Sequence, residues 1–155
     1  MKNNKSILTV ITIIMLAAIW IHSAMPAYAS DAESWWALEL VKPVLSVFVG
    51  AQNVTNHLVR KLAHFTEFFV LGAELFLMAQ VCISGRKDRL LIAAGAGFVA
   101  AFIDETIQLF AIGRSAEIKD VWLDFFGVAT AIVAGSVVWR VCRKRAGTLK
   151  NKDSQ

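Results

Sequence analysis

Four apolar runs alternate with short polar segments along the chain. The runs cover about residues 6–25, 65–83, 90–112 and 121–141. Each approaches the roughly 20 residues that a helix needs to cross about 30 Å of hydrocarbon at about 1.5 Å per residue. They lack the period-two alternation of strands, and only helices and closed barrels satisfy their backbone inside lipid. The pattern therefore predicts an all-α, polytopic membrane protein with about four transmembrane helices.

The segment between the first two runs, residues 26–64, has a helical pattern of its own. Its large apolar residues recur at near-helical spacing: Trp35, Trp36, Leu40, Val44, Leu45 and Phe48. Because Trp prefers the membrane–water interface, the segment is predicted to hold an outer interfacial helix. Ser30 and Glu33 fit a capping box at its start, and Pro43 predicts a kink or a division. Such a helix either caps the bundle or contacts lipid or a partner.

The first apolar run has two interpretations. Lys2 and Lys5 precede it, its length suits the apolar core of a signal peptide, and residues 27–29 resemble a small-residue cleavage site. With its flanks the run also approaches the length of a transmembrane anchor. The residues alone leave both open.

Composition supports a single membrane domain. The chain has 155 residues, and apolar residues make up 57% of it, above the roughly 45–50% of soluble domains. The net charge of +4 comes from Lys and Arg that flank the apolar runs, so nucleic acid is not predicted as a partner. We predict a transmembrane domain over residues 1–142 and a basic, partly disordered cytoplasmic tail over residues 143–155. Membrane lipids are the expected partners of such a chain.

The distribution of Lys and Arg predicts the orientation in the cell membrane. With both termini cytoplasmic, the larger basic group lies inside: Lys2, Lys5, Arg86, Lys87, Arg89, Arg140, Arg143, Lys144, Arg145, Lys150 and Lys152. The outer group is smaller: Lys42, Arg60, Lys61, Arg114 and Lys119. This topology puts Cys82 and Cys142 at cytoplasmic helix ends, where thiols stay reduced and a disulfide is not expected.

Ionisable residues interrupt the apolar runs at one predicted level. A charge inside a span costs roughly 2.5–3.5 kcal/mol on insertion scales, so it is rarely there without a role. The topology gathers ten polar residues near the outer ends of the last three runs: Arg60, Lys61, His64, Glu67, Asp104, Glu105, Gln108, Arg114, Asp120 and Asp124. We therefore predict one polar site at the outer membrane face.

Small residues predict which acids face the bundle interior. On the third run, a stripe of Ala93, Gly97 and Ala101 leads to Glu105. On the fourth run, Asp124 is followed by a second stripe: Gly127, Ala131 and Ala134. Small residues at this spacing allow transmembrane backbones to approach closely. Glu105 and Asp124 are therefore expected to point inward.

Three interpretations of the cluster remain open. The acids form an ion-paired plug with Arg60, Lys61, Arg114 and His64; or the cluster binds a polar or anionic envelope component; or it performs catalysis. A His-x-x-Glu pair is a weak metal signal, and the common catalytic motifs are absent from the sequence. No metal or cofactor is predicted, and the residues favour a non-enzymatic role without deciding it.

Three polar signatures, taken in order, resemble those of a known family. Arg60-Lys61-x-x-His64-Phe65-x-Glu67-Phe68 is followed by Asp104-Glu105-x-x-Gln108-Leu109-Phe110, then by Gly113-Arg114 and Asp120-x-x-x-Asp124-x-x-Gly127. This order is similar to that of the VanZ-like family of bacterial integral membrane proteins, over about residues 7–138. Phe68 departs from it, because a tyrosine is frequent at that position, and so the chain lacks one phenol.

The resemblance carries functional expectations. It implies that the first run is a retained helix, because the following residues look like the outer segment after the family's first membrane helix. The founding member is associated with resistance to the glycopeptide teicoplanin. The expected function is therefore interaction with a glycopeptide or an envelope component, which alters antibiotic susceptibility. A membrane enzyme acting on a lipid or cell-wall intermediate is the alternative, followed by a structural or partner-binding protein.

Overall fold

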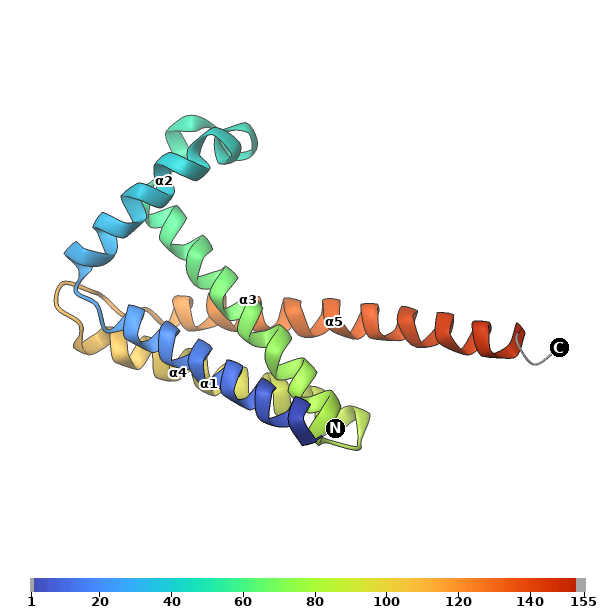
Figure 1. Ribbon diagram of the computed structural model, residues 1–155. Coiled ribbons are helices and arrows are strands. Elements are labelled where there is room, and N and C mark those ends of the chain that lie inside the picture. Colours follow the sequence, from blue (N-terminus) through green and yellow to red (C-terminus); the bar gives the residue numbers. More distant parts are fainter. Residues whose placement is uncertain (1, 153–155) are drawn as a thin grey trace.

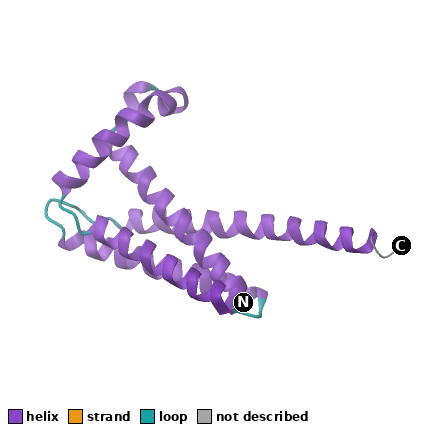
Figure 2. Cartoon of the chain, in the orientation of Figure 1, coloured by secondary structure: helices purple, strands orange, loops and turns teal. Residues whose placement is uncertain are grey.

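A computed structural model describes residues 2–152, and this part of the chain is helical throughout apart from short connections (Figures 1 and 2). Five α-helices and one short 3₁₀ turn, η1, follow in order: α1 Lys2–Ser23, α2 Ala27–Val49, η1 Ala51–Asn53, α3 Asn56–Cys82, α4 Arg86–Phe110 and α5 Ile118–Lys152. The predicted all-α class is confirmed.

Four of the helices are long and apolar enough to cross a membrane, as predicted. The candidate spans lie within α1, α3, α4 and α5: Lys5–Ser23, Asn56–Cys82, Arg86–Phe110 and Ile118–Arg145. The start of α3 differs from the prediction, because the helix begins well before residue 65. The Thr55 side chain accepts a hydrogen bond from the backbone N–H of Leu58 at 3.2 Å and caps this earlier start. The polar residues 56–64 are therefore helical.

Helix α3 is the centre of the bundle and contacts each of the other four helices. Its buried Phe68 and Leu71 pack in one core with Val128 of α5. The closest approach is to α5 at Gly127, where an added Cβ would lie 2.6 Å from the carbonyl oxygen of Phe65. Backbone-to-backbone packing of this kind is what small residues permit in membrane bundles. It fixes the position of α5 against the first half of α3.

Helix α2 and the first turns of α3 form a hairpin that projects from the bundle (Figure 1). Leu38, Val54 and Val59 make a small separate core inside it. Trp36 on α2 is 84% exposed, so the helix presents an apolar face away from the chain. The helix itself is confirmed, while its place at the lipid interface stays a prediction.

One local prediction about α2 is wrong, because the helix begins at Ala27, so Ser30 lies inside it and does not form the predicted cap. The helix runs through Pro43 without dividing, and a kink there stays a prediction. The start is supported by tertiary contact instead, because the Ala27 backbone N–H donates to the carbonyl oxygen of Ile112 at 2.9 Å.

The ends of the chain also sharpen the prediction. Helix α1 packs against α3 and α4 through its C-terminal half, where Ile19 and Ser23 are buried. The basic segment after Val141 is helical as far as Lys152, where the sequence predicted a partly disordered tail. Residues 153–155 of that predicted tail lie outside the described part of the chain.

Candidate functional site

The ten predicted polar residues come together where α1 and α4 end, α5 begins and α3 passes between them. We call this region the polar end. Its centre holds three ionisable side chains from three helices: His64, Asp104 and Asp124 are 7%, 0% and 1% exposed. His64 lies on the buried face of α3, and Asp104 lies one turn after the buried Ala100 on α4. The close contact at Gly127 places Asp124. We call these three residues the buried trio.

Potential ligand atoms of the buried trio all lie within 4.8 Å of one another. His64 Nδ1 is 3.8 Å from Asp104 Oδ2, which is too long for a direct hydrogen bond. Gln108 Nε2 donates to the same Asp104 oxygen at 2.9 Å. Within the trio, three buried atoms have no hydrogen-bond partner in the described part of the chain: His64 Nδ1, Asp104 Oδ1 and Asp124 Oδ2. The trio therefore has unused capacity to bind a further group.

Two of the predicted countercharges, Arg60 and Lys61, are paired with acids outside the buried trio. Arg60 Nη1 lies 3.4 Å from Asp31 Oδ1, and Lys61 Nζ lies 2.7 Å from Asp120 Oδ1. Arg114 donates to the carbonyl oxygen of His22 at 3.3 Å. Among the described ion pairs, none joins these cations to the buried trio. Ion pairs of lysine and arginine therefore lie at the rim of the site, and the centre holds only the 3.8 Å contact between His64 and Asp104 among the described ion pairs.

His22 at the end of α1 was missed by sequence reasoning. Its Nε2 lies 3.2 Å from Glu33 Oε2, and its Nδ1 lies 3.6 Å from Glu67 Oε1. Its ring also stacks on that of His64, with 6.1 Å between the centroids. The available signal was a titratable residue at the end of an apolar run, at the same predicted level as the other ten. His22 therefore links α1 and α2 to the polar end.

Glu105 has a structural role apart from the trio. It is buried, as its stripe predicts, and its Oε1 accepts a hydrogen bond from the backbone N–H of Glu117 at 2.5 Å. This contact secures the loop before α5. In the same loop, burial lowers the pKa of Arg114, and nearby Arg60 lowers it further. An arginine still remains protonated, so Arg114 contributes a positive charge.

The inward stripes are confirmed on α4 and shortened on α5. Ala93, Gly97 and Ala101 are buried, as expected. On α5 burial extends to Ala131, but Ala134 is exposed. The interior face of α5 instead runs through Asp124, Val128 and Ala131. These residues are four and then three positions apart, which keeps them on one face of a helix with 3.6 residues per turn.

A small cavity of about 30 Å³ opens at the polar end. Seven of its nine lining residues belong to the predicted set: Arg60, Lys61, His64, Gln108, Arg114, Asp120 and Asp124, with Ser115 and Leu123 completing it. One water needs roughly 10–15 Å³ on this kind of measure. The cavity therefore admits an ion, a water or the tip of a larger ligand, while the body of such a ligand stays outside.

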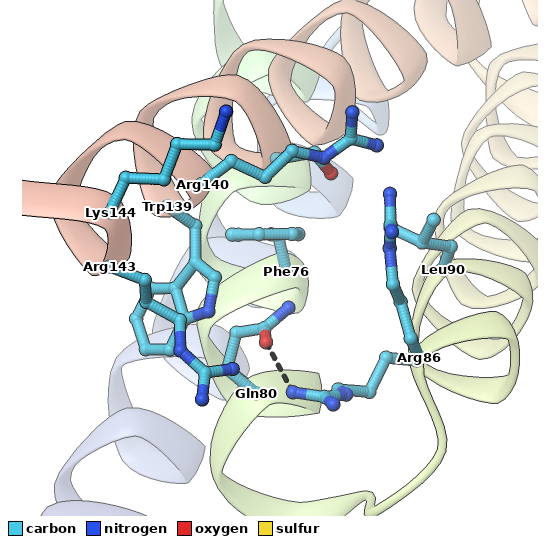
Figure 3. A pocket seen from close by; sticks show the side chains of 10 residues that line it. Phe76, Gln80, Arg86, Leu90, Trp139, Arg140, Arg143 and Lys144 are labelled. Atoms are coloured by element: carbon cyan, nitrogen blue, oxygen red, sulfur yellow. Dashed lines mark hydrogen bonds between the residues drawn. The ribbon is translucent and has the colours of Figure 1, made fainter. Parts of the chain in front are cut away.

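The opposite end of the bundle holds a larger cavity of about 260 Å³, between α3, α4 and α5 (Figure 3). We call it the basic cavity. Five cationic side chains line it: Arg86, Arg89, Arg140, Arg143 and Lys144. Phe76, Leu90 and Trp139 supply apolar walls, and Arg89 Nη1 donates to Gln80 Oε1 at 2.6 Å. The sequence indicated these cations only as markers of topology, since their convergence depends on helix packing.

The fold and the polar end together define a class: a multi-pass helical membrane protein with ionisable groups buried at one end of its bundle. Within this class, the chain belongs to the VanZ/LLP1 family, which matches it over residues 8–140. The match includes most of α1 and all three polar signatures, so the predicted resemblance is confirmed. Neither curated proteins nor solved structures show significant similarity to the chain.

Proposed function

We propose that the polar end is a binding site at the outer membrane face. The site recognises an anionic group of an envelope component or glycopeptide. Binding of this group alters the susceptibility of the cell to teicoplanin-type glycopeptides. The single observation that supports this most directly is the cationic rim of the small cavity. Arg60, Lys61 and Arg114 line it, and each is only partly buried. Guanidinium groups suit carboxylates and phosphates because they donate two parallel hydrogen bonds.

The test is expression of the chain in a glycopeptide-susceptible Gram-positive host. Arg114→Gln and Arg60→Gln should abolish the gain in the teicoplanin inhibitory concentration while membrane abundance stays at the wild-type level. Lys119→Gln is the matched control, because Lys119 is exposed nearby and does not line the cavity. A wild-type chain that changes no glycopeptide susceptibility, or rim variants that act like the control, would contradict the proposal. Loss of abundance in every rim variant would favour a structural role instead.

The outward orientation, with both termini cytoplasmic, is part of the proposal and has its own test. Cys82 and Cys142 are exposed thiols at the end of the bundle away from the polar end. A membrane-impermeant maleimide should therefore fail to label them in intact cells and should label them after permeabilisation. A cysteine introduced at Lys119 should show the reverse accessibility. Efficient labelling of the native thiols from outside would show that the chain has the opposite orientation.

A second candidate function is a membrane enzyme acting on a lipid or cell-wall intermediate. The observation that favours it is the buried trio, since an imidazole beside two carboxylates is an arrangement used for acid–base work. Turnover of such a lipid by the purified chain, abolished by His64→Gln and retained in Lys119→Gln, would support this function. Identical lipid profiles with and without wild-type protein would argue against it.

A further inference from the structure

We propose that the buried trio, His64, Asp104 and Asp124, binds one divalent transition-metal ion, with Zn²⁺ and Mn²⁺ as the best-matched candidates. This inference concerns the same end of the bundle as the proposed function but does not depend on it. It stands on the geometry, the burial and the missing partners of three side chains, and it replaces the sequence-based expectation that no metal is bound.

The donor set and its spacing fit such an ion. Imidazole nitrogen and carboxylate oxygen bind Zn²⁺ at about 2.0–2.2 Å, so two donors of one tetrahedrally coordinated ion lie roughly 3.4 Å apart. The trio's ligand atoms lie within 4.8 Å of one another. Small side-chain rotations toward the centre would complete the coordination. One imidazole with two carboxylates also suits Mn²⁺, which favours oxygen-rich ligand sets.

Charge supplies the second argument. Asp104 and Asp124 are almost fully buried, and each has an oxygen without a hydrogen-bond partner. The neighbouring Arg60 and Lys61 are committed to Asp31 and Asp120. A divalent ion bound by two carboxylates and a neutral imidazole leaves no net charge at the centre. Metal binding therefore offsets the burial of two negative groups that no described cation pairs with.

The surroundings of the trio have the features of a supported metal site. Gln108 donates to Asp104 Oδ2 and orients that carboxylate, as outer partners do for metal ligands. The ring of His22 stacks on His64, with 6.1 Å between the centroids. The cavity of about 30 Å³ is lined by His64 and Asp124. Because two of the three proposed ligands face this cavity, a water or a ligand atom in it can take a remaining coordination position.

The test is metal content of the full-length chain purified in detergent, stripped with chelator and reloaded with Zn²⁺ or Mn²⁺ separately. We expect about one ion per chain by mass spectrometry of the desalted protein, accompanied by a rise in melting temperature. Asp104→Asn and Asp124→Asn should lose both the ion and the melting shift. Glu105→Gln is the matched control, because Glu105 is an equally buried acid whose oxygen binds the loop backbone.

A second measurement separates metal binding from simple protonation of the acids. Co²⁺ loaded into the wild-type chain should give a visible absorption spectrum that changes when His64 is replaced by Gln. If the acids are merely protonated, the Asn variants melt like the wild type and no metal raises the melting temperature. That outcome, or equal metal content in Asp124→Asn and Glu105→Gln, would overturn the metal site while leaving the rim-binding proposal intact.

A different observation, the basic cavity, carries a second inference. We infer that this cavity binds the phosphate of an anionic lipid headgroup. Cationic side chains of α4 and α5 surround an opening of about 260 Å³, and no acidic residue lines it. Phe76 and Trp139 add apolar walls beside the charges, as Figure 3 shows. Basic pockets between membrane helices are suited to lipid phosphates, and the apolar walls are suited to the adjoining chains.

The test uses melting of the detergent-purified chain with added lipid. Phosphatidylglycerol should raise the melting temperature more than phosphatidylcholine, and inorganic phosphate alone should raise it little. The double variant Arg86→Gln/Arg143→Gln should lose at least about tenfold in lipid affinity. Lys87→Gln/Arg145→Gln removes the same charge outside the cavity and should retain binding. Equal losses of lipid affinity in both double variants would show that binding depends on net charge and not on the cavity. An equal rise in melting temperature with free phosphate would identify a phosphate site without lipid specificity.

Discussion

The two ends of the bundle place charge in opposite ways. At the polar end, ionisable side chains from α1, α3, α4 and α5 are buried or paired around a cavity of about 30 Å³. At the opposite, basic end, positively charged side chains surround the basic cavity of about 260 Å³, and no acidic residue lines it. Charge that remains near water keeps much of its solvation, whereas buried charge needs a proton, a partner or an ion. The difference predicts that substitutions at the polar end cost more stability than substitutions at the basic end.

The largest effect is expected from a change that separates the helices at the polar end. Gly127→Leu would force a side chain into the backbone of Phe65, 2.6 Å from the added Cβ. Overpacking commonly costs about 1–3 kcal/mol and can cost more when backbone must move. We expect low membrane abundance and a markedly lower melting temperature. Gly95→Leu is the control, because nothing lies within 4 Å of an added Cβ there; equal damage in both variants would refute the packing argument.

A moderate effect is expected at the rim of the polar end. Lys61→Ala removes the partner of Asp120, with which it forms a 2.7 Å ion pair. Both side chains are partly exposed, so the cost should be about 1 kcal/mol or less. The double variant Lys61→Ala/Asp120→Ala should recover part of the melting temperature, since it removes the unpaired carboxylate as well. A drop as large as that of Gly127→Leu would show that the rim is as tightly constrained as the centre.

The smallest effect on stability is expected at the basic end. Arg143→Gln removes one of several like charges around an open cavity. Surface substitutions away from buried partners usually stay within about 0.5 kcal/mol. The melting temperature without added lipid should therefore match that of the wild type. A clear loss of stability would mean that the basic cavity is a structural element, and the contrast between the two ends would fail.

The helices and the membership of the polar site were predictable because both follow from local pattern. Apolar runs define the spans, and a common position along those spans brings His64, Asp104 and Asp124 together. The pairing of the cations was not predictable in this way. Arg60 contacts Asp31 because α2 folds back beside α3. The hydrophobic periodicity of the sequence does not predict which helices pack together in this hairpin.

Tertiary contact also explains the failed local predictions. Ser30 and Glu33 have the spacing of a capping box, yet the helix starts at Ala27 because Ile112 supplies a partner for the Ala27 amide. His22 was missed because its importance comes from neighbours on α2 and α3. Such residues are recognised only when the segments that surround them are placed in space.

Helix α5 has a mechanical consequence. It extends over 35 residues, which corresponds to about 52 Å at 1.5 Å per residue, whereas the hydrocarbon layer measures about 30 Å. A helix that begins beside the polar end therefore passes well beyond the far side of the bilayer. The segment after Val141 is continuous with the helix that carries Asp124. A protein that bound this segment and displaced it would therefore act on the helix that contributes Asp124 to the polar end.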